Sequence, residues 1–193
     1  MNENSSSQPE DVAASVVRRI ADDLAWLANR TLHVDRMECD RRQEARPVGE
    51  GVSIGFRFAV EQEGRKHEGL LSMPLAEAIM FSAGLLGYDP KETLIAGALD
   101  APTQELKAGM VELSKFVAKA AKVQLSRSLH IPTQAEGRSC VGLRAGSVPQ
   151  VQGSHGFVTV QAEWSFHGRD PFEIQLSLDT LAFGPEERMG LAA

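Results

Sequence analysis

The first regular pattern along the chain predicts an amphipathic helix over residues 12–29. Asp11 is expected to cap this helix or to place an acidic group in its first turn. Because the apolar positions step by three and four, the period of an α-helix, they form one stripe that can lie on a sheet. These positions are Val12, Val16, Ile20, Leu24 and Leu27.

Two further helices are predicted in the middle of the chain. Pro74 suits a helix start and Gly87 a helix end, which indicates a helix over residues 75–86. A segment of partly helical composition, residues 89–101, leads into the longest predicted helix, residues 103–128. The apolar side of that helix comprises Leu106, Met110, Leu113, Val117, Ala120 and Ala121.

Alternation of apolar with small or polar residues predicts a β-hairpin between the first two helices. Residues 52–60 carry an apolar side chain at every second position, which is the clearest strand pattern in the sequence. Glu63 and Gly64 form the expected turn and residues 69–73 the return strand, so one face of the hairpin should be buried. The alternating apolar residues are Val52, Ile54, Phe56, Phe58 and Val60.

Shorter patterns predict the remaining strands. Residues 31–34 favour a short strand, and residues 40–50 a polar loop. Three more strands are expected over residues 138–144, 157–166 and 172–178, with the even-numbered side chains of 157–166 buried. Antiparallel hairpins with helices gathered on one side indicate an α+β fold, a mainly antiparallel sheet with long helices packed on one face.

Length and composition favour one globular domain. The chain has 193 residues, of which 42% are hydrophobic and 24% charged, and this suffices for a single core. Residues 1–9 are polar and expected to be disordered, residues 10–184 to form one domain, and residues 185–193 to form a loose tail.

Charge and cysteine content exclude several classes of protein. A formal net charge of −6 argues against a nucleic-acid binder and against attraction to an anionic membrane. No apolar stretch is long enough to span a bilayer, and the first residues lack a secretion signal, so a cytoplasmic protein without membrane insertion is expected. Cys39 and Cys140 lie in no metal-binding motif, and the sequence leaves open whether they pair.

The signatures of common enzyme classes are missing. The chain has no glycine-rich phosphate loop, no HExxH and no GxSxG motif. The histidines never stand four residues apart, so structural roles are expected and no metal site is predicted. They are His33, His67, His130, His155 and His167.

A stripe of charged residues marks the longest predicted helix. Glu112, Lys115, Lys119 and Lys122 step by three, four and three positions and therefore share one side of it. An ordinary solvated face, with Glu112 supporting Lys115, explains this pattern. Three lysines with one acid are also a local positive bias in an acidic protein, which suits an acidic partner surface.

The same segment carries a resemblance to a known family. Residues 112–125, ELSKFVAKAAKVQL, follow segment 69–74 and precede segment 132–137, both of which look like the flanking elements of that family. The chain resembles, over about residues 10–180, the CheC/CheX/FliY chemotaxis phosphatases. The matching motif residues are Glu112, Ala118, Ala121, Lys122, Gln124 and Leu125.

The resemblance implies a CheX-like fold and a defined chemistry. Family members remove the phosphoryl group from a phosphorylated CheY-type response regulator. Their motif glutamate, here Glu112, pairs with a lysine of the regulator, and an asparagine three residues later orients the attacking water. Lys115 stands at the asparagine position and Lys119 at a usual glycine. An ammonium group has no acceptor, so Lys115 cannot reproduce the role of the asparagine.

Three functional hypotheses follow from the resemblance. The first is a CheX-like signalling domain that binds the receiver domain of a response regulator through Glu112, Lys115 and Lys119, with lost or altered phosphatase activity. The second is an active aspartyl-phosphate phosphatase in which Glu112 is catalytic and another group places the water. The third is a structural assembly module of a flagellar-switch-like or motility complex.

The resemblance also bears on cofactors and oligomeric state. No cofactor is expected in this chain, since the Mg²⁺ of the phosphorylation reaction would belong to the receiver partner. A homodimer is expected, because antiparallel sheets with exposed edges can pair across a two-fold axis and CheX-like proteins resemble this arrangement.

Overall fold

A computed structural model describes residues 8–49, 51–151, 153 and 155–183. Its elements follow the chain in the order α1 (Pro9–Ala28), β1 (Leu32–Arg42), β2 (Ser53–Gln62), β3 (Arg65–Pro74), α2 (Leu75–Leu85), α3 (Pro90–Gly97), α4 (Gln104–Leu129), β4 (Thr133–Leu143), β5 (Phe157–Phe166), β6 (Phe172–Asp179) and the short 3₁₀ helix η1 (Thr180–Phe183). No helix of the described part is both long and apolar enough to cross a bilayer.

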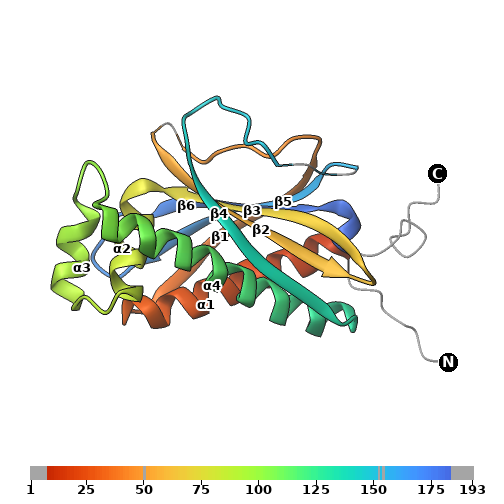
Figure 1. Ribbon diagram of the computed structural model, residues 1–193, viewed down its shortest axis with the longest axis horizontal. Helices are drawn as coiled ribbons and strands as arrows, with labels where there is room; N and C mark the ends of the chain where they lie inside the picture. Colours follow the sequence, from red (N-terminus) through yellow and green to blue (C-terminus); the bar gives the residue numbers. More distant parts are fainter. Residues whose placement is uncertain (1–7, 50, 152, 154, 184–193) are drawn as a thin grey trace.

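The strands form one six-stranded sheet in the order β1-β5-β6-β3-β2-β4, and every neighbouring pair is antiparallel. The long helices cover one face of it: α1 packs against β1 and β5, and α4 packs against β2 and β4 (Figure 1). The α+β prediction of an antiparallel sheet with helices on one face is therefore confirmed.

The main core lies between the helices and the sheet. The apolar stripe of α1 is buried except for Leu27, which is partly buried, and the predicted apolar side of α4 is buried throughout. From the sheet, Phe56, Phe58 and Trp164 are fully buried against them. Burying a side chain of this size stabilises the fold by about 1.5–3 kcal/mol. The 3.6-residue period of the helices and the alternation of β2 are thus both explained by one interface.

The other face of the sheet is covered as well, which corrects the prediction of a hairpin buried on one side. The loops that follow β1 and β4 lie over it (Figure 1), and a small second core forms there around Ala45, Leu70, Leu143 and Phe157. The side-chain amide of Gln175 donates a 2.7 Å hydrogen bond to the backbone carbonyl of Arg46 and fastens the first loop. Because these loops are irregular and mostly polar, the sequence has no periodic pattern that predicts the burial of this face of the sheet.

Strand β1 is longer than predicted. The sequence favours a strand over residues 31–34 and a loop from residue 40, whereas β1 continues to Arg42. It is an edge strand that pairs only with β5, and most of its side chains are exposed. Its apolar alternation is therefore weak, and its many charged residues are typical of an edge that resists pairing with other chains.

Some helices and strands begin at residues other than those predicted. Helix α1 begins at Pro9 with Gln8 as its N-cap, so Asp11 lies within the first turn and does not cap it. Strand β3 begins at Arg65 and β4 at Thr133, four and five residues before the predicted starts at 69 and 138. The predicted tail, residues 185–193, and residues 1–7 of the predicted disordered start lie outside the described residues.

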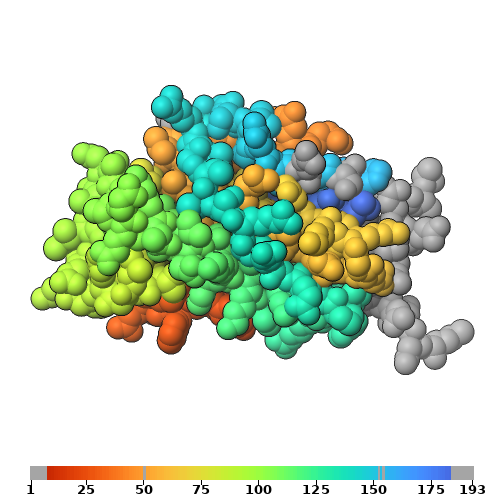
Figure 2. Space-filling model, in the orientation of Figure 1, coloured from red at the N-terminus to blue at the C-terminus, as the bar shows by residue number. Residues whose placement is uncertain are grey.

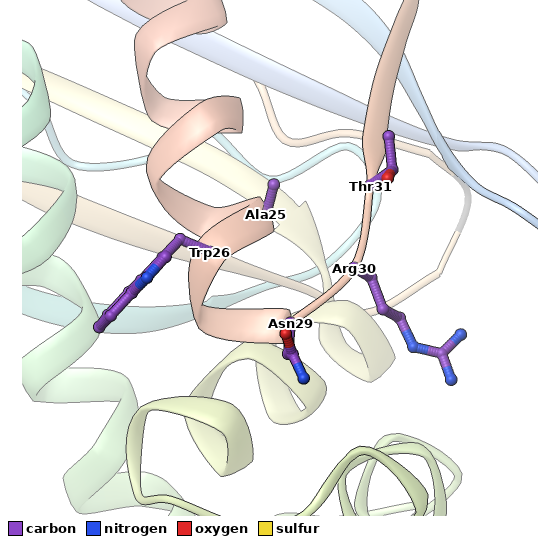
Figure 3. Close-up of a pocket in the computed structure, with 5 residues that line it drawn as sticks. All are labelled: Ala25, Trp26, Asn29, Arg30 and Thr31. Atoms are coloured by element: carbon purple, nitrogen blue, oxygen red, sulfur yellow. The ribbon is translucent and has the colours of Figure 1, made fainter.

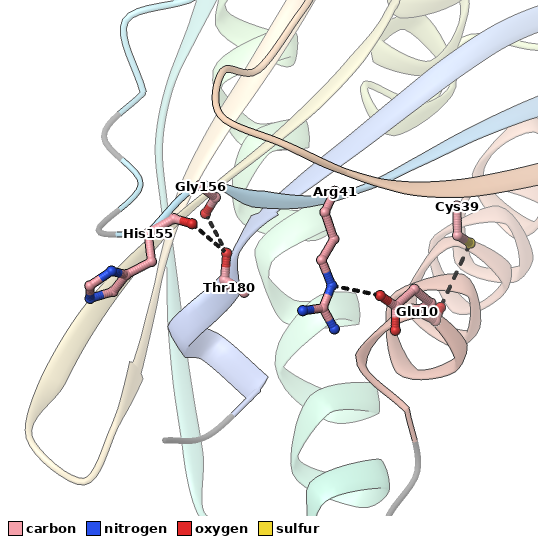
Figure 4. Close-up of polar contacts among 6 residues, drawn as sticks. All are labelled: Glu10, Cys39, Arg41, His155, Gly156 and Thr180. Atoms are coloured by element: carbon pink, nitrogen blue, oxygen red, sulfur yellow. Dashed lines mark hydrogen bonds and ion pairs between the residues drawn. The ribbon is translucent and has the colours of Figure 1, made fainter. Parts of the chain in front are cut away.

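Polar contacts tie the first helix, α1, and the last element, η1, to their neighbours (Figure 4). Arg41 of β1 donates a 2.8 Å hydrogen bond to the carboxylate of Glu10 in α1. Partial burial acts to raise the pKa of Glu10, but the hydrogen bond and charge of Arg41, with a backbone hydrogen bond, bring this pKa below its ordinary value. The Thr180 hydroxyl donates a 2.7 Å hydrogen bond to the backbone carbonyl of Gly156.

The sheet order predicts the redox behaviour of the two cysteines. Cys39 lies on β1 and Cys140 on β4, at opposite edges of the sheet. Five inter-strand steps of about 4.8 Å separate them by roughly 24 Å, far beyond the Cα separation of about 7 Å that a disulfide spans. We expect monomeric chain purified without reductant to show both thiols free when it is unfolded and labelled. A monomer band with neither thiol reactive would contradict the sheet order.

Candidate functional site

The candidate site lies on α4, whose ends are defined by local geometry. The Thr103 side chain caps the helix by accepting a 3.3 Å hydrogen bond from the backbone N–H of Leu106. His130 ends it in the left-handed conformation, with φ of 56°. Between these ends, the apolar side of the helix faces the core and the opposite side forms part of the molecular surface (Figure 2).

The charged stripe predicted from the sequence is exposed, except at its end. The Lys115 ammonium lies 2.6 Å from a carboxylate oxygen of Glu112, and their side chains are 58% and 56% exposed. Such a surface pair contributes about 0.2–1 kcal/mol to stability. Lys119 is exposed one turn further on and makes no hydrogen bond or ion pair with the described residues. Lys122 instead donates a 2.8 Å hydrogen bond to the side chain of Gln134 in β4.

Strand β4 passes directly over α4 at the site. A Cβ atom on Gly137 would lie only 2.4 Å from the backbone nitrogen of Lys115 and 2.5 Å from its Cα. The next residue, Arg138, has no partner on β2, so the strand bulges there. Buried Ser114 and Ala118 keep this side of α4 narrow. The backbone that carries Glu112 and Lys115 is therefore held against the edge strand of the sheet.

Helix α1 flanks the other side of α4. The Gln124 amide donates hydrogen bonds of 3.1 Å to Ser15 and 3.0 Å to Ser128. The first half of α1 therefore meets the last turns of α4, and the two helices run antiparallel (Figure 1). Near the end of α1, Trp26 is 77% exposed, and its indole extends toward α4 (Figure 3).

The exposed charges of the stripe determine what this side of α4 can do chemically. In the described part of the chain, no group of three or more His, Cys, Asp or Glu side chains is placed to hold a metal ion. Lys115 and Lys119 present only hydrogen-bond donors, and Glu112 only acceptors when ionised. The exposed ammonium groups can attract an acidic surface, while the Glu112 carboxylate can accept a hydrogen bond from a cationic side chain of a partner.

Two residues that shape this region were not assigned a role from the sequence. Gly137 belongs to a motif of the resemblance, but only the structure gives it a contact with α4. Trp26 falls between the apolar positions Leu24 and Leu27, off the buried stripe of α1. A large aromatic residue that falls outside the apolar stripe of its helix is expected to be exposed. The exposure of Trp26 could therefore have been predicted from the sequence.

Comparison with solved structures gives relatives of the same architecture. The chain is similar to FliY from Thermotoga maritima, with 13% identity and a TM-score of 0.66 over 98% of this chain and 97% of that one. It is similar to the chemotaxis protein CheX from Desulfovibrio desulfuricans, with 11% identity and a TM-score of 0.54 over 87% and 99%. It is also similar to the FliM middle domain from H. pylori, with 10% identity and a TM-score of 0.57 over 93% of each chain.

These likenesses establish a shared fold. No protein-family model matches the chain, and no curated protein matches it in sequence. At 10–13% identity, the solved structures show that the chain resembles the CheC/CheX/FliY family in architecture, as the motif around Glu112 indicates. What the chain binds depends on its exposed side chains, since one fold can carry several functions.

Replacing Gly137 with alanine tests the close passage of β4 over α4. The added methyl would overlap backbone atoms of Lys115, which cannot rotate away, so we expect a loss of about 1–3 kcal/mol in the free energy of unfolding. Gly142→Ala is the matched control, because nothing lies within 4 Å of a Cβ at that position of the same strand. Urea denaturation of both variants measures the difference, and equal stabilities would contradict the contact.

Proposed function

We propose that this protein is a chemotaxis or motility signalling domain that binds the receiver domain of a CheY-type response regulator through the exposed side of α4. The observation that carries the proposal is the placement of Lys115 and Lys119 beside Glu112 on an exposed helix of a FliY- and CheX-like fold. The three side chains form the binding surface, which we call the α4 face.

Charge supports a receiver as the partner. The phosphorylation pocket of a receiver is lined by carboxylates, and Lys115 and Lys119 can approach it as point charges. The chain as a whole is acidic, with a net charge of −6, so these lysines are a local departure that orients a partner. Glu112 is exposed enough to exchange its contact with Lys115 for a lysine of the receiver.

We further propose that phosphatase activity is lost or altered. Removing an aspartyl phosphate requires a group that orients water, and the Lys115 ammonium cannot accept the hydrogen bond that this needs. In the unbound protein, Glu112 is already engaged by Lys115 at 2.6 Å. An active phosphatase would need another water-placing group near Glu112.

A second candidate function is a structural module of a flagellar-switch-like assembly. The likeness to FliY and to the FliM middle domain favours it, because these are flagellar proteins and cover nearly the whole chain. In this alternative the α4 face would have no role in binding a receiver. Binding to a receiver, measured with purified proteins, separates the two functions.

We also propose a homodimer formed through β4. Both β1 and β4 are edge strands, but β1 carries six charged residues among its eleven, whereas β4 carries only Glu136 and Arg138. Charged edges resist strand pairing, so β4 is the edge better suited to pair with its symmetry mate.

Lys115→Asn tests the α4 face. Loss of one charge-assisted contact of about 1.5–3 kcal/mol should weaken binding to an unphosphorylated receiver roughly tenfold or more, and the difference should shrink as salt rises. Calorimetric titration at two salt concentrations measures it, using the CheY-type receivers of the source organism one by one. Phosphate release from the phosphorylated receiver is followed in parallel.

Lys107→Asn serves as the control, since it removes the same charge from the exposed start of α4, outside the α4 face. Equal affinities of the wild type and Lys115→Asn at both salt concentrations would remove position 115 from the binding surface. Rapid phosphate release by the wild-type protein would contradict the loss of phosphatase activity.

Light scattering at micromolar concentration tests the homodimer. We expect a mass of twice 20.9 kDa, because an unpaired β4 edge leaves backbone groups that a second copy satisfies. A mass of one chain across the concentration range would exclude the β4 pairing.

A further inference from the structure

Trp26 is an exposed aromatic residue that the packing of the protein itself does not explain. It is 77% exposed, the highest value among the large apolar side chains that the structure describes. The buried stripe of α1 is complete without it, since Ile20 and Leu24 of that stripe are fully buried. An indole presents about 150–250 Å² of mainly apolar surface, and leaving that surface in water is unfavourable unless a partner covers it.

The helix geometry places Trp26 beside the α4 face. Trp26 follows Ser15 by eleven residues, which is close to three helical turns, so both lie on the side of α1 that faces α4. Ser15 meets Gln124 and Ser128, and the helices run antiparallel. Counting eleven positions back along α4 from Gln124 and Ser128 reaches Leu113 and Val117. Trp26 therefore lies at the same level along the helix axis as Glu112, Lys115 and Lys119, on the flank of α4 opposite β4.

Figure 3 shows the direction of the Trp26 side chain. The indole of Trp26 extends from α1 toward α4, whereas Arg30 points to the opposite side of the helix. Trp26 also lines an open hollow at the end of α1, together with Ala25, Asn29, Arg30 and Thr31. The aromatic ring is therefore accessible to solvent on the flank of α1 that is next to α4.

We propose that Trp26 is the apolar anchor of the receiver-binding surface, one contact area with Glu112, Lys115 and Lys119. The anchor inserts into an apolar depression next to the acidic pocket of the receiver, while the lysines contact the carboxylates. This inference rests on the proposed function. Tryptophan is the side chain most enriched among the residues that dominate protein interfaces, where polar contacts surround it and exclude water.

The charges of the surface select an acidic protein over a second copy of this chain. A two-fold interface through this surface would bring Lys115 and Lys119 of one protomer toward the same residues of its partner. Such a like-charge contact is unfavourable, whereas an acidic receiver neutralises it. The exposed carboxylate of Asp22, on the same side of α1, remains available to a cationic residue at the rim.

The indole also bears on chemistry at this surface. Its N–H is a hydrogen-bond donor and it has no acceptor, so Trp26 cannot orient a water for attack on a phosphoryl group. Its contribution is to affinity, through burial of apolar area. This contribution should be insensitive to salt, unlike that of Lys115.

Fluorescence gives a direct test, because the chain has two tryptophans in different environments. Trp164 is fully buried, so a soluble quencher such as iodide reaches only Trp26. Addition of the CheY-type receivers of the source organism, one by one, should protect Trp26 of the full-length protein from iodide. Trp26→Ala should weaken binding about 30-fold at both low and high salt, and Trp26→Phe should restore part of it.

Ile95→Ala is the matched control, because Ile95 is a 68% exposed apolar residue on α3, a helix that contributes no residue to the proposed surface. We expect it to leave the affinity unchanged. If Trp26→Ala binds as tightly as the wild type while Lys115→Asn binds more weakly, the anchor is wrong and the α4 face stands. If no receiver binds the wild type, both proposals fail. If Trp26→Ala instead converts a dimer to a monomer, the indole belongs to a self-association surface and the anchor is overturned.

Discussion

The passage of β4 across α4 is the contact on which the geometry of the candidate surface depends. Backbone meets backbone there, with Gly137 against Lys115, so neither element can move toward the other. Because β4 is an edge strand, it pairs with only one strand, β2. Helix α4 packs against β4 and supports it further. The contact between β4 and α4 therefore also fixes the distance of Glu112 and Lys115 from the sheet.

Much of this fold could be predicted because one interface dominates it. A helix that buries a single stripe and a strand that buries alternate residues both have a periodic pattern of apolar residues in the sequence. Helices α1 and α4 and strand β2 have such patterns. Strand β1 has no such pattern, since an edge strand with an exposed face carries charged residues at positions where a central strand carries apolar residues. The second core is hidden for a related reason: its cover consists of loops, which have no period.

The candidate surface was predictable to a similar extent. The residues at 112, 115 and 119 share a face because the helical period requires it, whatever surrounds the helix. The place of Trp26 depends on which flank of α1 meets α4, and that follows from the side-chain contact between Ser15 and Gln124, more than a hundred residues apart. A contact between distant segments is set by topology, and no local pattern encodes it. The resemblance around Glu112 supplied the fold but no contact with α1.

The residues that hold the fold in this region differ from those proposed for binding, which is how one architecture can serve different partners. The exposed pair of Glu112 and Lys115 contributes at most about 1 kcal/mol, so either residue can change with little effect on folding. Gly137 and the buried side of α4 cannot change in this way, because the close contact leaves no space. Among the residues that the structure describes, the side chains of Lys119 and Trp26 make no hydrogen bond or ion pair, so they are open to selection by a partner. The chemistry of the surface is thus free to vary while the fold that presents it is held constant.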